Sequence, residues 1–455
     1  MIPLAGAAVL TAARMKEAEA ASGVDLADLM RRAGEGIAAA VHRLAAGAEV
    51  LVLCGTGNNG GDGWVAAASL ARGGLPVRVA ALGEPATDLA RAARAGWSGP
   101  VETLADAAPA PVLVDALFGT GLSRALPESA QAALVRLAGA ARLRIAVDVP
   151  SGVASDDGAV FGRVPRFDLT LALGAAKPVH IVQPGARYCG TVRLIDLGIA
   201  MPSDVHVLAR PDLPRPGPDA YKFSRGMVAV VPGPMHGAAL LASTAAMRAG
   251  AGYVLLLDGG EGPPHALVRR AWSPEALADP RIGAVLVGNG LGRDDEARRR
   301  VAAVLATDWP LVIDGDALRL VSPEELAALR RAVILTPHQG EFQALFGDLP
   351  GSKIDRARDA ARRSGVVVAY KGADTVIAAP DGRVALAGDA SDWLSTAGSG
   401  DVLAGTTAAM LAGGVDPFDA ACAAVWLNGE AARACGAAFI ADDLAYALTA
   451  ARASL

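Results

Sequence analysis

Short apolar runs alternate with longer, mixed segments along most of this chain. In the first half the runs lie at 50–53, 77–82, 112–114, 145–149, 169–173 and 192–195. In the second half they lie at 227–231, 253–257, 284–287, 311–313, 332–335, 366–370 and 375–379. Runs this short, bounded by glycine, are typical of buried parallel strands. Where helices separate such strands, the pattern predicts a parallel sheet with helices on both faces.

The helical patterns and one proline-rich segment divide the chain. Helices are predicted over 11–46 and near 237–249, 401–413, 417–434 and 441–453. Between the halves, residues 209–223 contain four prolines, and such a stretch acts as a semi-rigid spacer. We therefore expect an α/β protein with two domains, 1–209 and 221–455, joined by a linker over 210–220.

Composition narrows the class of protein. Of the 455 residues 52% are hydrophobic and 20% charged, with a net charge of -5 and 4% aromatics, which disfavours nucleic-acid binding. No uncharged apolar run reaches the roughly 18–20 residues of a membrane span, and the N-terminus lacks a basic signal region. The four cysteines form no CxxC pair, so neither a zinc site nor a disulfide framework is indicated. We expect a soluble cytoplasmic protein without a membrane partner.

A glycine-rich loop follows the first apolar run, in the segment VLVLCGTGNNGGDG at 50–63. Such a loop lets phosphate oxygens approach backbone N–H groups, and we expect a helix to begin near Asp62. The GxGxxG match of Gly55, Gly57 and Gly60 is weak evidence, because tight turns produce it too. The side-chain amides and the carboxylate over 58–62 offer oxygen ligands to a hard cation. The other explanation is that they cap the helix, with Asp62 as N-cap.

Two further strands end in acids, Asp115 and Asp148, and the second is followed by Ser151. Ligands bind at the carboxyl ends of the strands in open α/β sheets, so the three loops predict one shared site. Each aspartate taken alone is equally well explained as a helix cap or turn residue.

The motifs GTGNNGGDG, VDALFGTGLSR, VDVPSG and LALGAAKP resemble the NAD(P)H-hydrate epimerase domain over about the first 200 residues. The resemblance implies a Rossmann-like three-layer sandwich that interconverts the epimers of hydrated NADH and NADPH and binds K⁺. It places K⁺ at Asn59, Asp115 and Ser151, and proton transfer at Asp148 with Lys177 as a possible partner. Its ligand positions are Asn58, Asn59, Gly60, Gly61, Asp62, Gly119, Thr120, Gly121, Leu122, Ser123, Arg124, Ala125 and Asp148.

In the second half, the segment TAGSGDVLAG at 396–405 places small residues before a helix. Amides at such a helix start form an anion hole, and Asp401 lies beside it as a candidate general base or acid. An aspartate in the first turn also stabilises a helix dipole without any catalytic role. Glycine-bearing loops after other strands, at 233–239, 288–292, 314–318, 335–342 and 371–375, predict the rim of the same site.

These segments resemble NAD(P)H-hydrate dehydratase of the ribokinase-like superfamily, from about 221 to 450. The resemblance implies an α/β/α sandwich that dehydrates the S-epimer, with ADP converted to AMP and phosphate and with Mg²⁺. The implied hydrate-binding positions are Ala238, Gly290, His338 and Asp401, of which Asp401 is also catalytic. The implied nucleotide-binding positions are Lys371, Gly372, Ala373, Asp374, Thr375 and Gly400.

Two residues depart from the family pattern. Asn289 stands in GNGLG where GPGLG is usual, and we expect it to change local loop rigidity alone. His236 stands near a position where tyrosine is common, and we expect it to alter ligand contact.

The leading hypothesis is a bifunctional repair enzyme whose substrates are hydrated NADH, hydrated NADPH and ADP, and which forms a homo-oligomer. The alternative is an ATP-dependent kinase of a small hydroxylated metabolite, because the same anion hole and base suit phosphoryl transfer to an alcohol. A non-catalytic nucleotide-binding module in the first half is a third hypothesis, against which the four polar residues Asn59, Asp115, Asp148 and Ser151 argue.

Overall fold

The computed structural model describes residues 1–388 and 390–455 and contains two compact units, Met1–Val207 and Leu208–Leu455. Each unit has its own sheet and its own hydrophobic cores. The boundary between the units falls two residues before the predicted linker begins.

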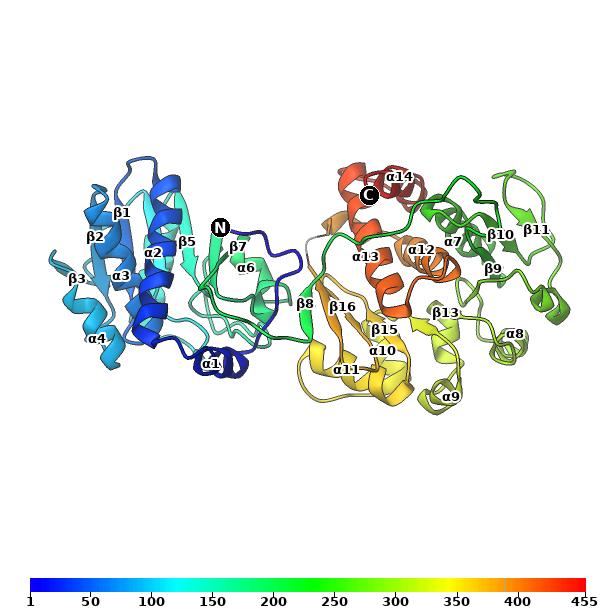
Figure 1. The fold of residues 1–455 in the computed structure, drawn as a ribbon, viewed down its shortest axis with the longest axis horizontal. Helices are drawn as coiled ribbons and strands as arrows, with labels where there is room; N and C mark the ends of the chain where they lie inside the picture. The colour runs from blue at the N-terminus through cyan, green and yellow to red at the C-terminus, as the bar shows by residue number, and fades with distance from the viewer. Residues whose placement is uncertain (389) are drawn as a thin grey trace. The chain divides into compact units, whose positions relative to one another are not determined.

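The first unit is built on a parallel sheet in the order β3-β2-β1-β4-β5-β6-β7 (Figure 1). Its strands are β1 (Val50–Cys54), β2 (Val77–Ala81), β3 (Val101–Thr103), β4 (Val112–Ala116), β5 (Leu143–Val147), β6 (Leu169–Leu173) and β7 (Thr191–Ile195), and β8 (Val205–Val207) follows. Its helices are α1 (Ala12–Ala21), α2 (Leu26–Ala45), α3 (Asn58–Arg72), α4 (Asp88–Ala95), α5 (Glu128–Ala140), the 3₁₀ turn η1 (Pro178–His180) and α6 (Ala186–Cys189).

Alternate residues of β1 serve two different cores. Val50 and Val52 pack in a cluster with α2 and α3, whereas Leu51 and Leu53 pack in a second cluster with α5. Both faces of the strand are therefore buried, which explains its continuous apolar sequence. The predicted three-layer α/β arrangement of this unit is confirmed.

The helical pattern over 11–46 forms two helices, because Asp25 accepts from the N–H of Ala27 and starts α2 afresh. The predicted start of the next helix near Asp62 is wrong. Helix α3 begins at Asn58 with Gly57 as its N-cap, so Asp62 is neither the N-cap nor near the first residue. Gly60 explains the earlier start, since a Cβ there would lie 1.9 Å from the carbonyl oxygen of Gly55. The glycines let the first turn of α3 pack directly on the loop.

The strands of the second unit lie in the order β11-β10-β9-β12-β13-β14-β15-β16-β17. They are β9 (Met227–Val231), β10 (Tyr253–Leu256), β11 (Val268–Arg269), β12 (Ala284–Val287), β13 (Leu311–Ile313), β14 (Val333–Leu335), β15 (Val367–Tyr370), β16 (Thr375–Ala378) and β17 (Val384–Ala387). Pairing is parallel from β11 to β15, but β16 and β17 are antiparallel, so this sheet is mixed.

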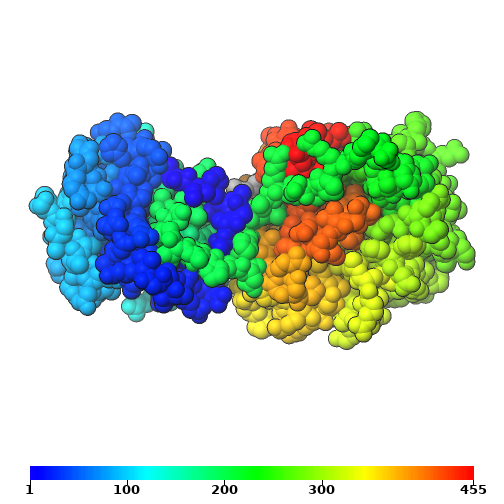
Figure 2. All heavy atoms as spheres, viewed as in Figure 1, coloured from blue at the N-terminus to red at the C-terminus, as the bar shows by residue number. Residues whose placement is uncertain are grey.

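The helices of this unit cover both faces of the sheet. They are α7 (His236–Ala249), α8 (Asp295–Leu305), α9 (Pro323–Ala328), α10 (Gln339–Phe346), α11 (Lys353–Ser364), α12 (Ser399–Ala412), α13 (Pro417–Cys435) and α14 (Ala441–Ala453), with 3₁₀ turns η2 (Pro274–Ala278), η3 (Gly315–Arg319) and η4 (Asp392–Leu394). Helices α7, α12, α13 and α14 share one large core with the sheet. Figure 2 shows the orange and red C-terminal segments beside green ones, and α12 and α14 both contact α7.

Within the described part of the chain, no helix combines the length and apolarity needed to cross a bilayer.

Candidate functional site

The carboxylate of Asp115 joins two of the predicted strand-end loops. It lies in β4, fully buried, and accepts hydrogen bonds from the Ser151 N–H at 2.9 Å and the Ser151 hydroxyl at 2.8 Å. The N–H of Leu117 donates to it as well, at 3.1 Å. Burial raises the pKa of Asp115 to about 6, although these donors oppose the rise.

Asn59 lies next to the same loops. The Ser151 hydroxyl accepts from the N–H of Phe118 at 2.9 Å, and a Cβ on the following Gly119 would lie 3.0 Å from the Asn59 side-chain oxygen. The buried Nδ2 of Asn59 has no hydrogen-bond partner among the described residues. Asn59, Asp115 and Ser151 are therefore gathered around one segment, and one buried amide there still needs a partner.

Asp148 and Lys177 form a buried ion pair. The Lys177 Nζ lies 2.5 Å from Asp148 Oδ1 and also donates to the carbonyl oxygens of Leu173 and Ala175. Asp148 has a φ of 64°, in the left-handed region that non-glycine residues rarely adopt. Such a backbone is held in place by its surroundings and is common at functional sites.

His180 fixes the pair from the other side. Its Nδ1 accepts from the Lys177 N–H at 3.0 Å, so its proton lies on Nε2, which donates to the Asp148 carbonyl oxygen at 2.7 Å. Burial lowers the pKa of His180 to about 4, and the charge of Lys177 acts in the same direction. The ring is therefore neutral at physiological pH and locks the strained backbone of Asp148.

Two more carboxylates face this pair. Burial raises the pKa of Asp62 well above its ordinary value, and the charges of Asp148 and Glu19 raise it further while Lys177 opposes them. Burial likewise raises the pKa of Glu19, against the attraction of Lys177. Asp62 and Asp148, predicted from separate motifs, are thus brought into one electrostatic cluster by α3 and by the end of β5.

The predicted ligand positions at 58–62 lie in the first turns of α3, where Asn58 accepts from the Thr87 hydroxyl at 2.7 Å. The predicted positions at 119–125 lie on the loop after β4. Its outer part, Gly121, Ser123, Arg124 and Ala125, is exposed, while Leu122 is half-buried. The carbonyl oxygen of Thr120 accepts from the Ser155 hydroxyl at 3.3 Å. This loop is anchored at Gly119 and Thr120 and open to solvent beyond them.

In the second unit, Asp401 lies at the start of α12, half-buried. Its Oδ1 accepts from Asn289 Nδ2 at 2.7 Å. Burial raises the pKa of Asp401 to about 6, with Asn289 and Lys371 opposing the rise and Asp314 and Glu341 adding to it. Gly398 precedes the helix with a φ of 89° and has no side chain that could cap it, so first-turn N–H groups remain available to an anion.

The predicted nucleotide positions divide into two groups. Lys371 donates to Asp314 Oδ1 at 2.8 Å, and a Cβ on Gly400 would lie 3.3 Å from the Lys371 Nζ, so Lys371 and Gly400 are adjacent. Asp374 is buried, and both its carboxylate and its carbonyl oxygen accept from Lys353. Gly372 and Ala373 lie in the same turn, and Thr375 begins β16.

The predicted hydrate positions also differ in their surroundings. Gly290 adjoins Ala238, since a Cβ on Gly290 would lie 3.1 Å from the Ala238 Cβ. His338 is the N-cap of α10, and its Nδ1 accepts from the N–H groups of Gly340 and Glu341, while its side chain is 59% exposed. The histidine therefore has a structural role as a cap whatever it binds.

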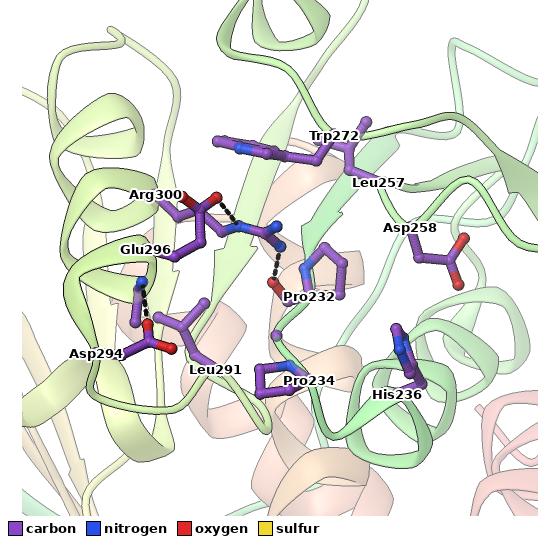
Figure 3. Close-up of a pocket in the computed structure, with 12 residues that line it drawn as sticks. Pro232, Pro234, His236, Leu257, Asp258, Trp272, Leu291, Asp294, Glu296 and Arg300 are labelled. Carbon is purple, nitrogen blue, oxygen red and sulfur yellow. Dashed lines mark hydrogen bonds and ion pairs between the residues drawn. The ribbon is translucent and has the colours of Figure 1, made fainter.

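A cavity of about 270 Å³ lies beside the loop that joins β9 to α7. In Figure 3, Arg300 and Glu296 lie on one side of it, and Asp258 and His236 on the other. Leu291, next to Gly290, also lines it. His236, one of the two departures from the family pattern, is exposed at the start of α7 and lines this cavity.

Sequence reasoning missed His180 as a partner of Asp148 and gave Asn289 too small a part. The sequence feature that could have indicated His180 is its position three residues after Lys177 in an apolar segment. The expectation that Asn289 changes loop rigidity alone is wrong, because its side chain is buried and contacts two carboxylates. Among the described residues, no cluster of three or more histidine, cysteine, aspartate or glutamate side chains is arranged to hold a metal ion.

The comparisons with known proteins cover both units. The family model described as NAD(P)H-hydrate dehydratase matches residues 228–452, and the one described as YjeF-related protein N-terminus matches residues 26–179. The crystal structure of an ADP/ATP-dependent NAD(P)H-hydrate dehydratase from Bacillus subtilis, co-crystallised with ATP and Mg²⁺, is 29% identical; the alignment covers 53% of this chain and 94% of that one, with a TM-score of 0.47.

Curated relatives match the chain over nearly its full length. A bifunctional NAD(P)H-hydrate repair enzyme from Salinibacter ruber is 35% identical, with 96% of this chain and 94% of the relative covered. A protein of the same name from Mycobacterium tuberculosis is 35% identical, with 86% of each chain covered. With both units matched in a single alignment, the chain belongs to the family of bifunctional NAD(P)H-hydrate repair enzymes.

Proposed function

We propose that this chain repairs hydrated NADH and NADPH, with epimerisation in the first unit and dehydration of the S-epimer in the second. The observation that supports this most is the full-length similarity to bifunctional repair enzymes, together with a buried carboxylate–lysine pair at the strand ends of each unit. An epimerase joined to an S-specific dehydratase clears a mixture of epimers completely.

In the first unit Asp148 transfers the proton. Its Oδ1 is fixed by Lys177 and by the N–H of Leu173, and its backbone is fixed by His180. The nearby Asp62 and Glu19 are the other carboxyls that can hold a proton, because burial raises the pKa of each. The proposed ligand positions at 58–62 and 119–125 border this cluster.

Asn59, Asp115 and Ser151 fit K⁺. All three side chains offer oxygen. Rotation of the Asn59 amide about its Cβ–Cγ bond would exchange its two polar atoms and place its oxygen where the unpartnered Nδ2 now lies. The bound cation would offset the negative charge of the ligand's phosphates. Asp115 also holds the Ser151 loop by three hydrogen bonds, so its carboxylate organises this site whether or not the ion is present.

In the second unit Asp401 is the proposed base. In the coupled reaction the terminal phosphoryl group of ADP passes to the hydroxyl oxygen of the hydrate, and Asp401 accepts the proton that this oxygen loses. The C–O bond of the hydrate then breaks, so that phosphate leaves with that oxygen, and loss of a proton from the neighbouring ring carbon restores the double bond. The first-turn N–H groups of α12 and the Lys371 ammonium face the phosphates. Mg²⁺ bound with the nucleotide would neutralise phosphate charge. Ala238, Gly290 and His338 are the proposed hydrate contacts.

The test is an assay of the full-length protein on mixed hydrated NADH, with ADP or ATP, followed by NADH absorbance. We expect complete conversion with ADP, conversion of the S fraction alone in an Asp148→Asn variant, and none in Asp401→Asn. Turnover that requires ATP and yields a stable phosphorylated product would instead establish the kinase alternative. Cytoplasmic location and homo-oligomer formation are further parts of this proposal, tested by fractionation and sedimentation.

A further inference from the structure

Asn289 lies in the turn after β12, buried at 2% exposure. Its Nδ2 donates to Asp314 Oδ2 at 3.0 Å and to Asp401 Oδ1 at 2.7 Å. Asp314 follows β13 and Asp401 lies in the first turn of α12, so one amide joins carboxylates from two different parts of the fold. Both acceptors are carboxylate oxygens, which fixes the orientation of the amide because its oxygen would be repelled there.

The side chain, and not the backbone, explains why asparagine stands at this position. The turn itself is made by the flanking glycines, with φ values of 123° at Gly288 and 64° at Gly290. A Cβ on Gly288 would lie 1.7 Å from the Asp314 carbonyl oxygen, so the approach of the two loops depends on glycine there. The Asn289 side chain supplies an NH₂ group with two hydrogens, one for each carboxylate. Proline has no such donor, and a hydroxyl could donate to only one of the two carboxylates.

The Asn289 contact matters more for Asp401 than for Asp314, because the two carboxylates differ in their other donors. Asp314 is already satisfied, since its Oδ1 accepts from Lys371 at 2.8 Å and from the Thr336 hydroxyl at 2.7 Å. Within the described residues, Asn289 is the side chain that donates to the Asp401 carboxylate. The other charged groups that act on Asp401 are Asp314, Lys371 and, from α10, Glu341.

We propose that Asn289 is a positioning residue for the dehydration reaction, and that its amide holds the Asp401 carboxylate in the reactive orientation by tying it to the Asp314–Lys371 pair. This inference rests on the proposed function of the second unit. It adds a side chain of the turn after β12 to the groups that orient Asp401.

The contact also affects the ionisation of Asp401. A donor to a carboxylate stabilises its charged form, so Asn289 lowers the pKa of Asp401 against the effect of burial. Removing the amide therefore raises the pKa of Asp401 further above its ordinary value. Less of the enzyme then carries the base as a carboxylate near neutral pH, and the acidic limb of the rate profile moves to higher pH.

The test compares full-length wild type with Asn289→Ala and Asn289→Ser in the dehydration assay. We expect Asn289→Ala to lower kcat by about 10- to 100-fold with a change in KM for hydrate and ADP below about 3-fold. Its acidic limb in kcat/KM should move up by ~1 pH unit, and Asn289→Ser, with one donor hydrogen, should recover part of both effects. Epimerisation in the same preparations reports that the first unit is intact.

Asn428→Ala is the matched control. Asn428 is also a buried asparagine of the second unit, 5% exposed, and its Oδ1 accepts from the Thr406 hydroxyl at 3.2 Å on α12. This variant should lower stability without moving the pH profile. The inference is overturned if Asn289→Ala has wild-type kcat and pH profile, or if Asn428→Ala moves the acidic limb equally. Failure of the wild type to dehydrate with either nucleotide would overturn the proposed function, and this inference with it.

Discussion

Both units place a lysine against a strand-end carboxylate, but the two lysines reach the proposed proton-transfer residue differently. In the first unit Lys177 contacts Asp148 itself, and its side chain is 1% exposed. In the second unit Lys371 contacts Asp314, and Asp401 is linked to that pair through the Asn289 amide. One sheet architecture thus fixes its carboxylate by a direct ion pair and the other by a neutral donor.

The difference matches the chemistry proposed for each unit. A carboxylate paired with a buried lysine keeps a fixed orientation, which suits a group that removes a proton and then returns it. Asp401 has no such ion pair among the described residues and lies at a helix N-terminus, so it can accept a proton while phosphates occupy the amides beside it. Variants of Asp401, Lys177 and Lys371 distinguish these two arrangements.

The largest effect is expected from Asp401→Asn. Loss of a general base lowers rates by about 10²- to 10⁴-fold, and the shape of the side chain is kept, so dehydration should fall by about 10³-fold while ADP binding changes little. Calorimetric titration with ADP and the NADH assay measure both quantities. Epimerisation by the same variant is the control and should match wild type; dehydration near the wild-type rate contradicts the assignment.

The second-largest effect is expected on the free energy of unfolding. Lys177→Met leaves the buried Asp148 carboxylate unpaired, and breaking a buried pair costs about 3–5 kcal/mol. Lys371→Met should cost less, because Asp314 keeps the donors Thr336 and Asn289 and the lysine is 18% exposed. Thermal unfolding of both variants tests this. Equal losses, or a larger loss for Lys371→Met, would show that the two pairs do not differ as described.

The fold was largely predictable, and the errors have physical causes. The buried strands β1, β9 and β12 have uninterrupted apolar sequences, so their positions were predicted within one residue. The antiparallel pairing of β16 and β17 was not predicted, because β17 is a short apolar run and direction is not visible in such runs. The charged helices α8 and α11 were missed since much of each surface is polar.

The candidate site was predictable as a set of loops but not as a set of contacts. Strand-end acids such as Asp115 and Asp148 are recognisable because parallel strands bring their carboxyl ends to one edge. The role of Asn289 was predicted from its backbone alone. The sequence does not show that Asp314, 25 residues later, and Asp401 come within hydrogen-bond distance of the Asn289 amide. His180 lacks a motif, and its role depends on the left-handed backbone of Asp148.

Within the first unit, a smaller effect should distinguish Asp115, which holds the Ser151 loop, from Asp148, the proposed proton-transfer residue. Asp115→Ala removes three hydrogen bonds that hold the Ser151 loop, so hydrate binding and epimerisation should weaken together, by about tenfold or more. Asp148→Ala should lower the rate by about 10²-fold with less effect on binding, as expected of a group that acts in the transition state.

Calorimetry of both variants with hydrated NADPH, at low and high K⁺, separates these roles. We expect added K⁺ to strengthen hydrate binding to wild type and to Asp148→Ala, but not to Asp115→Ala. If binding is lost in Asp148→Ala alone, the two assignments are reversed.

The smallest effect is a pH dependence of stability in the second unit. Folding raises the pKa of Asp401 from its ordinary 3.8 to about 6, so the folded state binds this proton more tightly than the unfolded chain does. The stabilisation is complete below the unfolded pKa and is lost as the pH rises through the folded pKa. The amide introduced by Asp401→Asn does not ionise, so this variant should gain stability relative to wild type by about 1 kcal/mol between roughly pH 5 and pH 8.

Denaturant unfolding at both pH values measures this gain. The exposed Asp419→Asn is the control, and it should show the same difference in unfolding free energy from wild type at each pH. A difference that stays constant for Asp401→Asn would mean that burial does not penalise this carboxylate, and that the site in the second unit needs no amide to keep its base charged.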